Sequence, residues 1–86
     1  MGLYWLTYKR NGRLAGVAIL SADSLMAARM HASAHGISKG AMFEQGHMLD
    51  AQIAMQLPQN LVGRMLERRE AGELLAQIER GVGNVL

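Results

Sequence analysis

Two histidines, His31 and His35, have the spacing in this chain that best fits a chemical role. They are four positions apart in a stretch with helical periodicity, and this spacing can direct two imidazoles toward one metal ion. A zinc-protease helix also carries a glutamate directly after its first histidine, but this chain has Ala32 there. We therefore predict two exposed helix histidines and no cofactor, and keep a metal-dependent function through His31 and His35 as the least favoured alternative.

Other patterns of enzyme active sites are missing from the sequence. The serines stand outside any nucleophile-elbow motif, and each fits a turn, a helix cap or a helix surface. The glycine-containing segment 36–40 follows an expected helix, whereas a phosphate-binding loop precedes one. The chain contains no cysteine, which excludes disulfides and thiolate metal sites. We therefore expect a protein that is not an enzyme.

Positive charge is concentrated at the tip of an expected β-hairpin, on Lys9, Arg10 and Arg13. A basic tip can contact phosphates, but no aromatic residues alternate with these cations to stack on bases. Residues 1–40 carry five basic and one acidic side chain, and residues 41–86 carry four basic and six acidic ones. The two halves could therefore attract each other within or between chains. Nucleic-acid binding through the hairpin tip is our alternative function.

A β-hairpin is predicted for residues 3–20. The dipeptide Asn11-Gly12 is a strong signal for a two-residue type I′ turn, which needs positive φ at both central residues. This turn sets a register that pairs Leu6 with Val17 and Trp5 with Ala18. Both faces of the hairpin are apolar, so we expect it to be covered on both sides.

An amphipathic helix is predicted for residues 23–35. Asp23 is the expected N-cap, and Gly36 can end the helix in the left-handed conformation. One apolar stripe is made of small residues and suits close packing on a sheet. The other contains Met26 and Met30, whose adaptable side chains could meet the last helix or a second copy of the chain.

The second half of the chain is predicted to form two more strands and a helix. Residues 41–47 have moderate strand character, and apolar residues alternate with polar ones over 50–57. We interpret 50–57 as a strand, with a helix capped by Asp50 as the rival. Residues 67–80 have helical periodicity, and 82–86 are expected to form a loose tail.

These elements predict an α+β fold of order ββαββα, with an antiparallel sheet and helices packed on one face. The 86 residues suffice for one domain, which we assign to residues 1–81. We expect no leader sequence. Apolar runs fall far short of the roughly 20 residues that cross a bilayer, so we expect a cytoplasmic protein that does not enter membranes.

The chain resembles short alphaproteobacterial proteins of unknown function in three places. The resemblance is carried by ADSL at 22–25, GHMLD at 46–50, and Pro58 followed by GRML at 63–66. It spans most of the chain and suggests a bacterial protein. It implies no activity, because none is known for that group.

Our leading functional prediction is a small interaction or regulatory module that self-associates. Two helices cannot cover both faces of the hairpin and both stripes of helix 23–35 in so small a domain. A symmetric homodimer is the commonest remedy, because one patch then meets its own copy. The predicted self-association residues are Trp5, Met26 and Met30. An unidentified protein partner is a further option.

Overall fold

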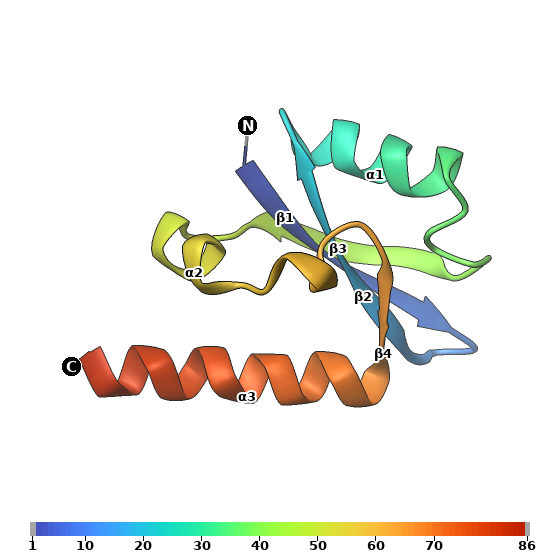
Figure 1. The fold of residues 1–86 in the computed structure, drawn as a ribbon. Coiled ribbons are helices and arrows are strands. Elements are labelled where there is room, and N and C mark those ends of the chain that lie inside the picture. The colour runs from blue at the N-terminus through green and yellow to red at the C-terminus, as the bar shows by residue number, and fades with distance from the viewer. Residues whose placement is uncertain (1, 86) are drawn as a thin grey trace.

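A computed structural model describes the backbone of residues 2–85 and the side chains of residues 2–78. The predicted α+β class is confirmed, with a four-stranded antiparallel sheet and helices in the order ββαβαβα (Figure 1). The elements are β1 (Gly2–Arg10), β2 (Arg13–Ala22), α1 (Leu25–Ala34), β3 (Met42–Met48), α2 (Ala51–Gln56), the 3-10 turn η1 (Gln59–Leu61), β4 (Met65–Glu67) and α3 (Arg68–Val85).

The hairpin supplies the two central strands of the sheet, whose order is β3-β1-β2-β4. One edge is β3, with seven residues, and the other is β4, with three. Beyond β4, an isolated bridge between Ile19 and Val62 continues the contact with β2. The Gly63 N–H also donates to the Ile19 carbonyl at 2.8 Å. The loop before β4 therefore extends the contact along β2 by one residue, to Ile19.

The hairpin turn is as predicted, but the register beyond it is wrong by one residue. Asn11 and Gly12 both have positive φ, at 53° and 76°, and Arg10 lies opposite Arg13. A β-bulge then leaves Ala15 without a partner between the two strands. As a result Leu6 lies opposite Ala18 and Trp5 opposite Ile19.

Close packing next to the bulge explains the register. Gly16 lies opposite Tyr8 on β1 and opposite Glu67 on β4. A Cβ on Gly16 would collide with the Leu66 carbonyl oxygen and would lie 2.8 Å from Met65 Sδ. The bulge therefore places the one residue of β2 that lacks a side chain where β4 approaches most closely.

The helices are divided between the two faces of the sheet, in place of the predicted packing on one face (Figure 1). On one face, α1 packs through small side chains in a cluster of Leu6, Tyr8, Ala18, Leu20, Ala22, Ala28 and Ala32. The opposite cluster joins the sheet to α3 and the α2 region, through Trp5, Val17, Ile19, Leu49, Leu57, Leu66, Ala71 and Leu74. The division follows from the hairpin itself, because both of its faces are apolar.

Helix α1 is capped by Ser24, which corrects the predicted N-cap at Asp23. Ser24 has extended dihedral angles, and its hydroxyl oxygen accepts a hydrogen bond from the Ala27 N–H at 3.1 Å. Asp23 lies one residue too early to receive that N–H and is exposed. Gly36 has a φ of 65°, so the predicted left-handed residue after the helix is confirmed.

The predicted strand over 50–57 is wrong, and the rival helix is correct. Helix α2 is capped by Asp50, whose Oδ1 accepts from the Gln52 N–H at 2.9 Å. Leu49 and Leu57, at the two ends of this segment, are buried. The apolar side chains that alternate in the sequence therefore anchor the ends of a short helix and do not line one face of a strand. The fourth strand is β4, in a stretch for which no strand is predicted from the sequence.

Helix α3 begins at Arg68, one residue after the predicted start, and continues to Val85. The backbone of 82–85, predicted to be a loose tail, is therefore helical, and Leu86 lies outside the described residues. The glycine at 81 does not end the helix, since a glycine in a helix interior costs only about 1 kcal/mol relative to alanine. In the described part of the chain, no helix is both long and apolar enough to span a membrane.

Arg64 ties the loop before β4 to the first turn of α3. Its two terminal nitrogens donate to the two carboxylate oxygens of Glu70 at 3.2 and 2.8 Å, and its Nε donates to the Asn60 carbonyl at 3.1 Å. The hydrogen bonds from Arg64 hold the pKa of Glu70 below its ordinary value of 4.5, with a smaller contribution from the Glu67 backbone.

This ion pair predicts a pH dependence of stability. Because the pKa of Glu70 is lower in the folded state, its stabilisation is complete above the unfolded value of 4.5 and is lost as the pH falls through the folded value. Glu70→Gln is therefore expected to lower the melting temperature slightly at neutral pH and to have a smaller effect near pH 3. Thermal melts of both proteins across this range measure the difference. Glu73→Gln is the control, and an unchanged difference at low pH would contradict the prediction.

Candidate functional site

Trp5 does not belong to a surface, which corrects its predicted role in self-association. Its side chain is only 8% exposed and packs in the cluster shared with α3 and the α2 region. The hairpin was expected to be covered on both faces, but with 50–57 interpreted as a strand no segment was assigned to cover Trp5. Of the three predicted self-association residues, Met26 and Met30 remain accessible, with 60% and 64% of their surfaces exposed.

Met26 and Met30 face a hollow between α1 and the start of β3. The hollow has a volume of about 400 Å³ and is lined by Tyr8, Met26, Arg29, Met30, Ser33, Ser38, Ala41 and Phe43. Two more exposed methionines, Met42 and Met48, begin and end β3. We call this hollow, together with β3 and its two methionines, the α1–β3 surface.

The base of the hollow is built from aromatic rings. Tyr8 and Phe43 meet edge to face, with ring centroids 5.9 Å apart, and the Arg29 guanidinium lies 4.1 Å from the Phe43 ring centroid. Burial raises the pKa of the Tyr8 hydroxyl, an effect that nearby Arg29 partly offsets. The base of the hollow is therefore held by packed rings, while its methionine rim stays exposed.

β3 leaves one backbone edge unpaired in the described chain. Within residues 2–85 it pairs only with β1, and a bulge leaves Glu44 without an opposite residue. Glu44 forms an ion pair with Lys9 across the strands, at 3.0 Å. An exposed edge strand presents a row of N–H and C=O groups that can pair with another strand.

The three cations of the predicted basic hairpin tip have different contacts and do not form one patch. Lys9 is paired with Glu44, and Arg10 Nη2 donates to the Lys39 carbonyl at 2.6 Å. Arg13 remains exposed and lines a separate hollow at the turn. Two of the three cations therefore contact other parts of the chain, which weakens the case for a common phosphate site. Nucleic-acid binding through them is untested and stays a prediction.

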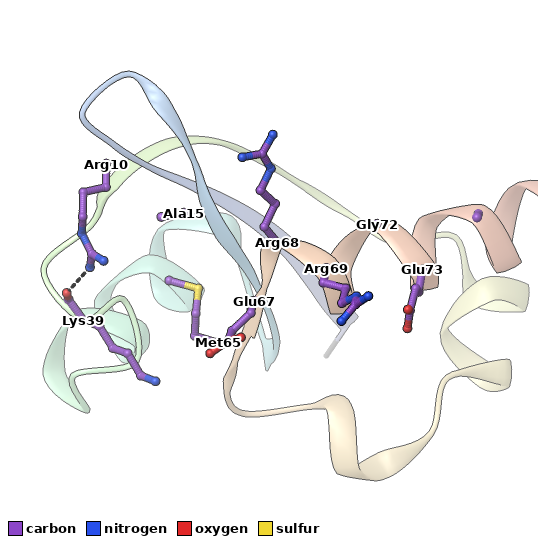
Figure 2. A pocket seen from close by; sticks show the side chains of 10 residues that line it. Arg10, Ala15, Lys39, Met65, Glu67, Arg68, Arg69, Gly72 and Glu73 are labelled. Carbon is purple, nitrogen blue, oxygen red and sulfur yellow. Dashed lines mark hydrogen bonds between the residues drawn. The ribbon is translucent and has the colours of Figure 1, made fainter.

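The structure instead brings Arg10 together with cations that are distant in the sequence. A groove of about 910 Å³ is lined by Arg10, Ala15, Lys39, Met65, Glu67, Arg68, Arg69, Gly72, Glu73 and Ala76 (Figure 2). Arg10 and Lys39 lie at one end of it, and Arg69 and Glu73 at the other (Figure 2). We call it the basic groove. The sequence could not indicate it, because the antiparallel contact of β4 with β2 brings α3 to the hairpin.

His31 and His35 lie together, as their helical spacing predicted. Their ring centroids are 4.3 Å apart, the rings are tilted by 34°, and both residues are exposed. Among the described residues, no His, Cys, Asp or Glu side chain completes a group of three that could hold a metal. Two imidazoles alone provide fewer ligands than a zinc site in proteins uses, so a metal-dependent function stays an untested alternative.

The comparisons with known proteins give no relative for this chain. A scan against protein-family models, a search of curated proteins and a search of solved structures each find no match. The resemblance to short alphaproteobacterial proteins therefore stays a prediction, and the functional argument depends on the surfaces described above.

Proposed function

We propose that this protein is a non-enzymatic interaction module that self-associates through the α1–β3 surface. The observation that carries the proposal is that an unpaired edge strand and exposed methionines belong to one surface. Met26 and Met30 rim the hollow beside β3, and Met42 and Met48 mark the ends of the strand itself. A second copy would find both backbone hydrogen bonds and apolar contacts there.

The geometry of an edge strand favours a symmetric partner. When two copies meet across a two-fold axis perpendicular to the sheet, their edge strands run antiparallel, and the contact is the same on both sides. β3 contains no lysine or proline, which are common devices against such pairing. The two sheets would then join into one continuous sheet, with α1 of both copies on the same face.

Methionine side chains suit the apolar part of this contact. Met30 exposes 64% of its surface beside an aromatic base held by Arg29, and burying apolar surface contributes roughly 25 cal/mol per Å². The flexible thioether chain adapts to the surface that it meets. A charge at this position would have to leave water on association, which opposes the dimer.

The test compares one methionine inside the surface with one outside it. Light scattering of a dilution series is expected to show a monomer–dimer equilibrium for the unmodified chain. Met30→Glu should raise the dimer dissociation constant by roughly tenfold or more, as expected when a charge enters an apolar contact. Met55→Glu is the matched control, because Met55 is 85% exposed on α2 and lies outside the α1–β3 surface.

Two results would contradict the proposal. One is a monomer mass for the unmodified chain at the highest soluble concentration. The other is an equal effect of Met30→Glu and Met55→Glu on the dissociation constant, which would indicate a general effect of added charge. Melting temperatures of both variants show whether the folded state itself is changed.

A further inference from the structure

We propose that the basic groove binds an acidic, partly apolar peptide segment of another protein. The proposal is independent of self-association, since no residue of the basic groove belongs to the α1–β3 surface. Four cations, two carboxylates and an uncharged base line this groove.

Within the described side chains, none of the four cations of the groove forms an ion pair. The two ion pairs among the described side chains join Lys9 with Glu44 and Arg64 with Glu70, and none of these four residues lines the groove. The groove cations are Arg10, Lys39, Arg68 and Arg69, and all four are exposed. A ligand carboxylate would therefore find cationic partners that no described acidic side chain holds in an ion pair.

A hydrogen bond fixes one end of the groove. Arg10 Nη2 donates to the Lys39 carbonyl at 2.6 Å (Figure 2), which joins the end of β1 to the loop after α1. Lys39 has a positive φ of 51°, a conformation that is uncommon for a residue with a side chain. The end at Arg10 is thus held by a hydrogen bond from the Arg10 side chain before any ligand arrives, and an ordered site loses less entropy on binding.

The base of the groove is uncharged. It contains Ala15, left unpaired by the hairpin bulge, and the half-buried Met65 of β4. Gly72 and Ala76 continue this uncharged base along α3. Apolar side chains of a ligand could be buried there, and methionine adapts to different shapes.

The same lining favours a peptide over a nucleic acid. Glu67 and Glu73 lie among the cations, and their charges would repel a continuous phosphate backbone. The lining contains no aromatic ring on which a base could stack. A peptide can instead place separate carboxylates near the cations and apolar side chains against Met65, which matches the arrangement of the groove.

The experiment selects ligands from a phage-displayed library of random peptides on the immobilised full chain. Enriched peptides are expected to carry net negative charge together with apolar residues. The most enriched peptide, synthesised with a fluorescent label, is then titrated by anisotropy. Arg68→Glu combined with Arg69→Glu should weaken its binding by roughly tenfold or more, because like charges then face the ligand.

Control variants separate the groove from general charge effects. Arg13→Glu changes a cation that does not line the basic groove, so it should leave peptide binding within roughly twofold of the unmodified chain. Lys39→Glu tests the opposite end of the groove, and it decides the matter if the double arginine variant fails to fold. Met30→Glu should bind the peptide normally, even where it abolishes self-association.

Three outcomes would overturn the proposal. The selection could enrich no acidic peptides, or the enriched peptide could bind the groove variants as tightly as the unmodified chain. In the third, a labelled single-stranded oligonucleotide would bind more tightly than the peptide and lose its affinity on the same substitutions. That last result would make the groove a nucleic-acid site.

Discussion

Gly16→Ala is expected to lower the free energy of unfolding by about 3 kcal/mol, the upper part of the range for overpacking. The added Cβ would collide with the Leu66 carbonyl oxygen and lie 2.8 Å from Met65 Sδ. A backbone carbonyl cannot rotate away as the end of a side chain can, so β4 has to separate from β2. Urea unfolding followed by the fluorescence of Trp5, the single tryptophan, measures the change.

The matched control is the same substitution at an open position. A Cβ at Gly72 in α3 would meet nothing within 4 Å. Gly72→Ala should therefore stabilise the protein by up to about 1 kcal/mol, through helix propensity alone. If Gly16→Ala left the unfolding midpoint unchanged while Gly72→Ala raised it, β4 would not approach β2 as closely as described.

Features that depend on neighbouring residues could be predicted from the sequence. The turn at Asn11-Gly12 was correct because the required positive φ is a property of those two residues. The left-handed conformation of Gly36 after α1 was predicted correctly for the same reason. The start of α1 was missed by one residue, since Asp23 and Ser24 are both good caps and the backbone dihedral angles decide between them.

Features that depend on distant contacts could not be predicted. The bulge at Ala15 exists where Gly16 meets β4, a strand that lies about fifty residues later in the chain. The segment 50–57 has an alternation that fits either a strand or a short helix with buried ends. Single-sequence patterns cannot separate these cases, because burial at Leu49 and Leu57 is a tertiary property.

The candidate surfaces also combine features set by neighbouring residues with features set by distant contacts. The sequence predicts that Met26 and Met30 share one helical stripe, but their exposure depends on where α3 packs. Burial of Trp5 depends on where α2 and α3 pack, which no pattern of neighbouring residues indicates. The basic groove brings Arg10 near Arg68 only when the strands have paired, so no local sequence motif could predict it.

Leu66→Ala is expected to lower the free energy of unfolding by about 3 to 4 kcal/mol, as for other fully buried leucines. Leu66 is 0% exposed and lies opposite Val17 in the middle of a three-residue strand. Its side chain belongs to the cluster that contains Ala71 and Leu74, so the cavity would weaken the packing of α3 on the sheet. Hydrogen exchange should show the largest loss of protection in α3.

A second leucine provides the control for that experiment. Leu75 lies in α3 but is 45% exposed, and Leu75→Ala should change the free energy of unfolding by less than about 1 kcal/mol. The slope of the unfolding free energy against urea concentration should be the same for both variants if each keeps the unmodified fold. Equal losses at positions 66 and 75 would mean that α3 does not pack on the sheet through the buried cluster, and that the basic groove, which needs α3 beside β2, does not form.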